Sequence, residues 1–144
     1  MPAQQESPAL AVARAHVAAW AEKDFDEARR MLAPDVHVTV TAANPGFPVT
    51  DLNGSEAYME GLVTFATPIV AGSVRELAAV GDGSAALLTL DLQMAGGPFG
   101  AGAQAPCARL YLVEDGKVKT EQVIFYVGQE EAWKLATRAT RPSA

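Results

Sequence analysis

The stretch DFDEARRMLAPDVHVTV, residues 24–40, holds a short helix, a corner and the start of a strand. Asp24 is a good N-cap for the helix. The apolar side chains after it share one helical face: Phe25, Ala28, Met31 and Leu32. Because Pro34 disfavours helical geometry at Ala33, the helix should end at this corner. The next apolar residues alternate with polar ones, as in a strand with one buried face: Val36, Val38 and Val40. A helix leading straight into a strand predicts helices packed on a sheet.

Two further helices are indicated on either side of this stretch. Ser7 and Pro8 suit the start of a helix over residues 8–22. Its stripe recurs at three-to-four spacing: Val12, Ala15, His16, Ala19 and Trp20. Asn53 and Glu56 resemble a capping pair for a third helix. The stripe of that helix is Tyr58, Leu62 and Phe65. Residues 42–54, which contain two prolines and two glycines, predict a loop.

The second half of the chain predicts strands over residues 73–80, 84–94, 107–114 and 117–127. Asp115-Gly116 fits a two-residue turn between the last two. The element order predicts an α+β fold, in which a curved antiparallel sheet wraps around three N-terminal helices and encloses a concavity. One domain over residues 1–144 is expected, with flexible tails at 1–6 and 129–144.

Composition excludes several functional classes. The net charge is −6, and the first sixty residues carry nine carboxylates against four bases, so nucleic acid is not an expected partner. No apolar run approaches the roughly 18 residues of a membrane span, and the N-terminus lacks a secretory pattern, so we expect a cytoplasmic protein without membrane association. Cys107 is the single cysteine and fits a packed hydrophobe. His16 and His37 lie on different elements, so no metal and no cofactor are expected.

Several landmarks together carry a family resemblance: Trp20 with Asp24-Phe25-Asp26, MLAPDV at 31–36, NGSEAYMEGL at 53–62 and LVEDGKV at 112–118. With them, residues 8–128 resemble the SnoaL-like branch of the nuclear transport factor 2-like superfamily, the cone-shaped fold of ketosteroid isomerase, scytalone dehydratase and polyketide cyclases. The resemblance implies a homodimer formed through the outer face of the sheet and a pocket for a small hydrophobic molecule.

The resemblance also marks three positions of the isomerase site. The slot of its general-base aspartate falls on Val40, and the slot of its protonated aspartate falls on Ala108. A valine cannot accept a proton, so steroid isomerisation by that mechanism is excluded. The slot of its oxyanion-hole tyrosine falls on His16, which lies on the buried stripe of the first helix.

Glu121 is the second candidate for chemistry. A plain two-residue turn pairs Glu114 with Lys117 and so sets Leu110 opposite Glu121 and Ala108 opposite Val123. Glu121 would then be a carboxylate on a mostly apolar face, where an unpaired charge is costly. If His16 were its partner, the two would form a catalytic acid–base dyad. The alternatives are a core histidine bonded to a backbone carbonyl, and a Glu121 that is solvated near the mouth or paired with a lysine.

The helix and strand faces predict which side chains contact a substrate: Trp20, Val38, Val40, Tyr58, Leu62, Leu90, Ala108, Leu110, Val123 and Phe125. The opposite face of the sheet should form the dimer contact: Thr89, Asp91, Gln93, Arg109, Tyr111, Thr120 and Gln122. At the corner, Asp35 should bond local backbone amides, and His37 should face outward or into a dimer contact.

Three functions are compatible with these residues. The first is a cofactor-independent cyclase, isomerase or dehydratase that acts on a hydrophobic polyketide- or steroid-like molecule through His16 and Glu121. The alternative is a non-catalytic module that binds a hydrophobic ligand or scaffolds a partner. The third is an epoxide hydrolase-like reaction through Asp91 and Arg109. This third reading is disfavoured because the inward leucines of the same strand turn Asp91 away from the pocket.

Overall fold

The computed structural model describes residues 7–42, 50–96, 102 and 104–125. The predicted tails at 1–6 and 129–144 therefore lie outside the described residues. The helices are α1 (Pro8–Ala21), α2 (Phe25–Arg30) and α3 (Ser55–Ala66). The strands are β1 (Leu32–Ala42), β2 (Thr50–Asn53), β3 (Arg75–Gly81), β4 (Ala85–Asp91), β5 (Cys107–Glu114) and β6 (Lys117–Phe125).

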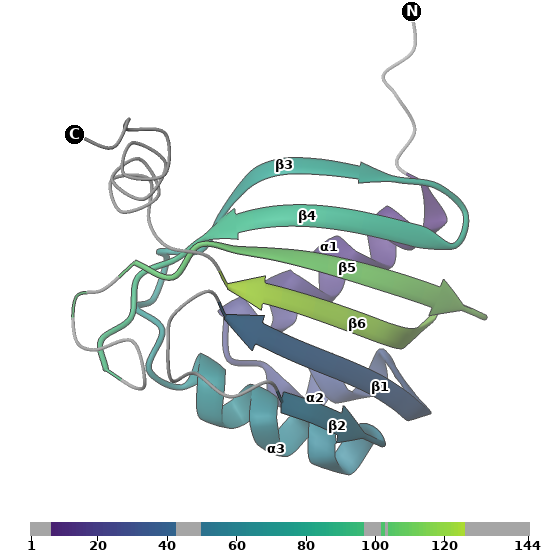
Figure 1. Ribbon diagram of the computed structural model, residues 1–144, viewed down its shortest axis with the longest axis horizontal. Helices are drawn as coiled ribbons and strands as arrows, with labels where there is room; N and C mark the ends of the chain where they lie inside the picture. Colours follow the sequence, from purple (N-terminus) through teal and green to yellow (C-terminus); the bar gives the residue numbers. More distant parts are fainter. Residues whose placement is uncertain (1–6, 43–49, 97–101, 103, 126–144) are drawn as a thin grey trace, which may run out of the picture.

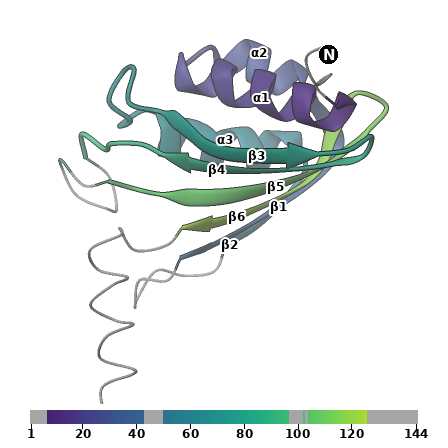
Figure 2. The same ribbon diagram turned by 90° about the horizontal axis from the view of Figure 1, so that it is seen from above.

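The six strands form one curved, open sheet in the order β2-β1-β6-β5-β4-β3, and the helices lie on one of its faces (Figures 1 and 2). Neighbouring strands run antiparallel except β1 and β6, which pair in parallel. This arrangement confirms the predicted α+β class with its three helices and curved sheet. Among the described residues, no helix is long and apolar enough to cross a bilayer.

Two of the three predicted helix starts are confirmed. The Ser7 hydroxyl accepts a hydrogen bond of 3.2 Å from the Leu10 amide, and the Asp24 side chain accepts from the Glu27 amide. The predicted cap of α3 is wrong. Gly54 occupies the cap position with φ of 91°, and no side chain bonds the first turn.

The corner between α2 and β1 is sharper than the sequence predicts, because β1 already begins at Leu32. Pro34 falls where the β1–β6 pairing is irregular, between Leu32 and His37, so its missing N–H breaks no ladder bond there. Asp35 forms an exposed ion pair with Lys119, and His37 contacts Asp51 of β2. The corner therefore leads the chain into the sheet, and its polar side chains, Asp35 and His37, form contacts at the surface and do not line the cavity.

Part of the predicted 42–54 loop is a strand. Residues 50–53 form β2, which pairs with residues 37–40 of β1 at the edge of the sheet. The short strand carries the alternation of a half-buried edge, with Thr50 and Leu52 partly buried and Asp51 and Asn53 exposed. β2 adds a wall beside α3 that the sequence reading did not anticipate.

The β5–β6 hairpin contains a bulge that changes which side chains face inward. Glu114 pairs with Lys117, as the turn predicts, but Leu112 pairs with Thr120, so β6 holds one extra residue. A shift of one residue turns the pairing partners onto the other face of the sheet. The predicted Leu110–Glu121 and Ala108–Val123 pairs are therefore wrong.

In the observed register, Tyr111 lies opposite Glu121 and Arg109 lies opposite Val123. Arg109 and Tyr111, which were expected on the outer face, are 2% and 0% exposed under the helices. Leu112, which shares its strand face with Leu110, is 43% exposed on the outer face. The bulge thus brings a cation and a phenol from β5 to the face that carries Glu121.

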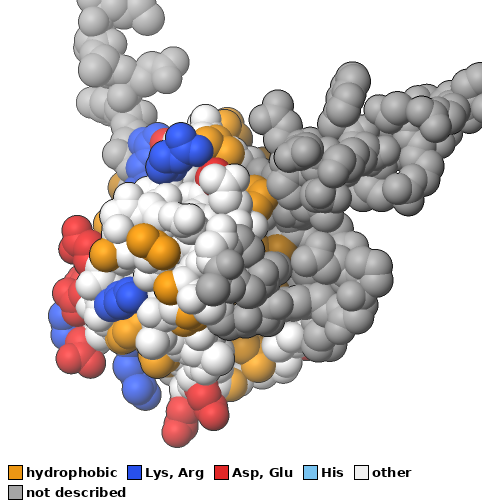
Figure 3. Space-filling model, turned by 90° about the vertical axis from the view of Figure 1, so that its left-hand side faces the viewer, with side chains coloured by type: hydrophobic (Ala, Val, Ile, Leu, Met, Phe, Trp, Pro, Cys, Tyr) orange, Lys and Arg blue, Asp and Glu red, His pale blue; other side chains and the backbone are white. Residues whose placement is uncertain are grey.

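The acidic side chains are unevenly distributed over the surface. At the end of the molecule seen in Figure 3, they gather along one side and the lower edge, and the hydrophobic side chains between them are scattered. This distribution agrees with the net charge of −6 and offers no broad basic surface at this end for phosphate groups.

Candidate functional site

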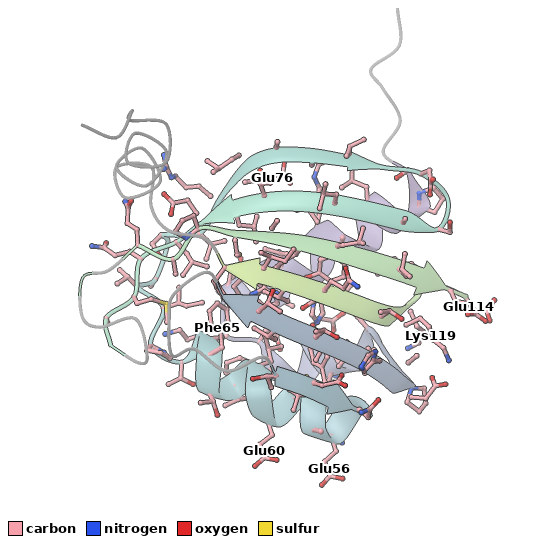
Figure 4. All side chains as sticks on the ribbon, in the orientation of Figure 1. Glu56, Glu60, Phe65, Glu76, Glu114 and Lys119 are labelled. Atoms are coloured by element: carbon pink, nitrogen blue, oxygen red, sulfur yellow. The ribbon has the colours of Figure 1, made fainter. Side chains whose placement is uncertain are left out.

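A cavity of about 540 Å³ lies between α3 and the sheet. The strand wall is mostly aliphatic and aromatic: Val38, Val40, Thr50, Leu52, Val123 and Phe125. The helix wall comes from successive turns of α3: Ala57, Tyr58, Glu60, Gly61, Leu62, Thr64 and Phe65. Glu60 projects from α3 away from the sheet, so the outer part of this wall is exposed (Figure 4). A cavity of this volume and polarity suits a small, largely apolar molecule.

A buried ion pair marks the inner end of the cavity. Arg109 on β5 and Glu121 on β6 both line it and are 2% and 1% exposed. Arg109 Nη1 donates to Glu121 Oε1 at 3.0 Å, and the Tyr58 hydroxyl donates to Glu121 Oε2 at 2.8 Å. Each carboxylate oxygen thus has a donor, which offsets the cost of burying the charge.

Aromatic rings flank the Arg109 guanidinium. Its Cζ lies 4.7 Å from the centre of the Trp20 ring and 5.2 Å from the centre of the Phe65 ring. Phe65 comes from α3, near the end of the helix seen at the left of Figure 4. Cation–π contacts of this kind hold the guanidinium in place without using its N–H donors. Arg109 Nε is buried and has no hydrogen-bond partner among the described residues.

His16 lies behind the cavity wall. It comes from the inner face of α1, is 0% exposed and is not among the lining residues. Its Nδ1 lies 3.2 Å from the Tyr111 hydroxyl, and its ring contacts the rings of Tyr58 and Tyr111 edge-on. His16 therefore contacts the two tyrosines, one of which binds Glu121 directly.

The buried polar cluster is neutral overall at pH 7. Burial lowers the pKa of His16 to about 4, with Arg109 adding to this and Glu121 opposing it, so the imidazole is uncharged. Burial and the nearby Glu121 charge raise the pKa of the Tyr58 and Tyr111 hydroxyls well above their usual value, so both keep their protons. The remaining charges, on Arg109 and Glu121, cancel.

The structure brings six of the ten predicted contact residues to the cavity: Val38, Val40, Tyr58, Leu62, Val123 and Phe125. Trp20 and Leu90 are buried in the core behind it. Ala108 and Leu110 do not line it, because the bulge places them on the outer face. The predicted dyad is not formed as a direct hydrogen bond: within the described part of the chain, Glu121 binds Tyr58 and Arg109, and His16 binds Tyr111.

Sequence reasoning missed Arg109 as a cavity residue. A plain hairpin register assigned it to the outer face, and nothing in the local sequence marks the extra residue in β6. One signal was available, because a buried carboxylate requires a cation or several donors. Arg109 is the nearest basic residue on the neighbouring strand, and a register shifted by one residue places it on the same face as Glu121.

Asp91 and Arg109 do not form the pair considered for epoxide chemistry. Asp91 Oδ2 accepts from Arg75 Nη2 at 3.1 Å across the β3–β4 ladder, whereas Arg109 binds Glu121. Cys107 is buried, and burial raises the pKa of its thiol, which fits a packed side chain. In the described ranges, no three His, Cys, Asp or Glu side chains come together in a way that could hold a metal ion.

Comparisons with known proteins agree with this geometry. A family model described as a SnoaL-like domain matches residues 13–121. No protein of curated function matches the chain significantly. A crystal structure of a protein from Kribbella flavida DSM 17836 superposes with a TM-score of 0.70 at 26% identity, covering 92% of this chain and 98% of that one.

Two more distant structures share the fold. A candidate ketosteroid isomerase from Kribbella flavida DSM 17836 has a TM-score of 0.62 at 17% identity, over 82% of this chain and 77% of that one. An epoxide hydrolase of limonene epoxide hydrolase-like type from M. tuberculosis has a TM-score of 0.60 at 21% identity, over 92% and 95%. At these identities the likeness shows the fold alone.

Proposed function

The chain belongs to the SnoaL-like family, and from this membership and the cavity geometry we propose that it is a cofactor-independent enzyme of acid–base chemistry. Its substrate would be a small, neutral, hydrophobic molecule that carries a carbonyl oxygen, and its reaction an isomerisation, cyclisation or dehydration. The observation that carries the proposal is the Arg109–Glu121–Tyr58 cluster at the inner end of an otherwise apolar cavity.

The cluster supplies the two groups that such a reaction needs. A guanidinium has five N–H donors, and Arg109 uses one of them on Glu121, which leaves donors for a carbonyl oxygen in the cavity. Glu121 would take a proton from the carbon beside that carbonyl. The electron pair left by the proton becomes an enolate, whose oxygen Arg109 stabilises, and Glu121 then returns the proton at the same or another atom.

Tyr58 and His16 would act by positioning. Tyr58 holds Glu121 Oε2, and its raised pKa means that it stays a donor throughout the working pH range. His16 contacts the rings of both tyrosines and bonds the Tyr111 hydroxyl opposite Glu121. We assign His16 the role of keeping the tyrosines in place, instead of the direct partnership with Glu121 that the sequence suggested.

The neutral charge of the cluster favours a neutral substrate. Arg109 already has a counterion, and His16 is uncharged at pH 7 because its pKa is about 4. A carboxylate or phosphate entering the cavity would lose its hydration without meeting an unpaired cation, which costs several kcal/mol. Ketones, esters and phenols carry acceptor oxygens without this penalty.

Hydrogen–deuterium exchange at carbon tests the proposal without knowledge of the natural substrate. The neutral ketone 4-phenylcyclohexanone is incubated with the protein in D₂O, and the loss of its α-hydrogen signals is followed by proton NMR. The wild type should accelerate the exchange, because Glu121 removes the α-proton and returns a deuteron. Glu121→Gln should slow it by a factor of about 10²–10⁴, while the ketone still binds.

The control is Glu56→Gln, which removes an exposed carboxylate from α3 outside the cavity (Figure 4) and should leave the exchange rate unchanged. Acceleration that survives Glu121→Gln would refute the assignment of the base. Binding of the ketone to the wild type without any exchange would refute proton abstraction at carbon. If no epoxide is opened either, it would support the alternative, a module that sequesters hydrophobic ligands.

Epoxide opening is a second candidate because the cavity holds a carboxylate, an arginine and a phenol together. Glu121 would take a proton from water, whose oxygen attacks an epoxide carbon as the ring C–O bond breaks. Arg109 would stabilise the alkoxide that forms, and Glu121 would return the proton to it, which gives the diol. Two assays separate the reactions: exchange of the α-hydrogens of the ketone, and hydrolysis of styrene oxide, which is also a neutral aromatic molecule. Diol formation that depends on Glu121 would favour the hydrolase.

A further inference from the structure

Gly61 lies in the middle of α3 and lines the cavity. Its backbone is helical, and it is not among the glycines with positive φ, so alanine would fit the backbone there. Glycine inside a helix costs about 0.5–1 kcal/mol relative to alanine. The reason for glycine at this position therefore has to be space, because local geometry does not require it.

The side chain of Leu52, on β2, occupies the space next to Gly61. A Cβ built at Gly61 would lie 2.8 Å from Leu52 Cδ1, which is closer than carbon atoms approach in folded proteins. Leu52 also lines the cavity, so the two residues face each other across the junction of the helix wall and the strand wall. The atom in the way is the far end of a flexible side chain, so the chain can fold with alanine if Leu52 moves.

The residues that flank Gly61 on the cavity side of α3 are also small. Ala57 lies one turn before it and Thr64 lies three residues after it, and both are small and line the cavity. The large side chains of the helix, Tyr58 and Leu62, point toward the buried side. Small residues therefore form the helix wall at Ala57, Gly61 and Thr64, and Leu52 packs closely against it at Gly61.

Arg109, at the inner end of the same cavity, offers a hydrogen-bond donor to a ligand. Arg109 lines the same space, is 2% exposed and keeps a buried Nε–H without a partner among the described residues. Buried donors in folded proteins are nearly always bonded, so an acceptor beside Arg109, from water or from a ligand, would complete the cluster at the inner end.

We propose that Gly61, together with Leu52, determines the width of the ligands that the cavity admits. The inference rests on the proposed function, since it concerns the same cavity. A methyl group at residue 61 would push Leu52 into the space between the walls, while the Arg109–Glu121 cluster would stay unchanged. The substitution should therefore discriminate by ligand shape and not by the polar group that the ligand carries.

Two neutral ketones of nearly equal carbon count make the test. 4-Phenylcyclohexanone is long and narrow, and 9-fluorenone is flat and wide. Titrations followed by amide NMR shifts give both dissociation constants for the wild type and for Gly61→Ala. We expect Gly61→Ala to weaken 9-fluorenone by about tenfold or more and 4-phenylcyclohexanone by less than about twofold. The double variant Gly61→Ala/Leu52→Ala should recover the affinity for 9-fluorenone.

Gly83→Ala is the matched control, because a Cβ there would meet nothing within 4 Å and the residue does not line the cavity. It should leave both dissociation constants unchanged. If the wild type binds both ketones and Gly61→Ala weakens them equally, or not at all, the width inference is wrong and the proposed function stands. If the wild type binds neither ketone, the proposed function falls, and the inference falls with it.

Discussion

Glu121 lies directly opposite Tyr111 in the β5–β6 ladder, and its Oε1 accepts a hydrogen bond of 3.0 Å from Arg109 on the same neighbouring strand. The extra residue in β6 creates this relationship. Without it, Leu110 would lie opposite Glu121, and a buried carboxylate would have no cation beside it. The bulge therefore positions the chemistry as well as shaping the sheet.

The Arg109–Glu121 pair should be costly to break from one side. Arg109→Leu leaves Glu121 buried without its cation, so we expect a loss of roughly 3–5 kcal/mol in the free energy of unfolding. The double variant Arg109→Leu/Glu121→Leu removes both charges and should be more stable than Arg109→Leu alone. Urea unfolding of the three proteins measures this. A double variant that is less stable than the single one would contradict the expectation that the unpaired Glu121 charge causes the loss.

His16 should make the protein sensitive to mild acid. Its pKa is about 4 in the folded chain, below the ordinary value of 6.5, so between these values the unfolded state binds a proton that the folded state does not. Stability should therefore be intact above pH 6.5 and fall by about 3 kcal/mol as the pH drops toward 4. Urea unfolding midpoints at several pH values follow this loss.

The fall in the free energy of unfolding between pH 6.5 and 4 can be assigned to His16 only if replacing that residue removes it. His16→Gln should flatten the pH dependence between 6.5 and 4, even if it lowers stability at neutral pH by breaking the Tyr111 contact. His37→Gln replaces the other histidine, which lies at the surface, and should keep the slope. An unchanged slope in His16→Gln would mean that the imidazole is already charged or solvated in the folded protein.

The outer face of the sheet should form a homodimer. It carries apolar side chains that are exposed on adjacent strands: Val80, Leu87, Leu112 and Ile124, with exposures of 64%, 40%, 43% and 49%. Such a patch on a sheet face favours a protein partner over water. Light scattering should give a dimer for the wild type and a folded monomer for Leu112→Glu.

Val63→Glu is the control for this change, because Val63 is comparably exposed, at 38%, but lies on α3 away from the outer face. It should remain dimeric. A wild type that stays monomeric at high concentration would rule out the expected interface, and a monomer caused equally by both variants would show that the effect is not specific to the sheet face.

The sequence was informative wherever a local rule decides the structure. The Ser7 and Asp24 caps and the Asp115-Gly116 turn depend on neighbours within a few residues, and the structure has each of them. The helix stripes hold only in part, because Ala15 of α1 is exposed and β1 already begins at Leu32, before Pro34. The family landmarks around the corner and the hairpin added the cone shape, which short-range patterns alone do not specify.

The site was only half accessible from the sequence because it depends on register. His16 was expected on the buried stripe of the first helix, and Glu121 either on an apolar face or solvated near the mouth; both are buried. Their partners were not foreseen, because one extra residue in β6 changes which face of β5 lies beside Glu121. Arg109 and Tyr111 share that face, and Leu110 and Leu112 lie on the opposite one. β2 was missed for a different reason: four residues between proline-rich and glycine-rich positions give too short a pattern to distinguish a strand from a loop.

The most direct test of the central claim is the carbonyl carbon signal of 4-phenylcyclohexanone labelled with ¹³C at that atom and bound to the protein. If the ketone oxygen meets the free N–H donors of Arg109 beside Glu121, the signal should move downfield of its position in water, since a charged donor polarises the carbonyl more than water does. A bound signal at the upfield position typical of hydrocarbon solvent would contradict the account, because the oxygen would then lie against the apolar walls.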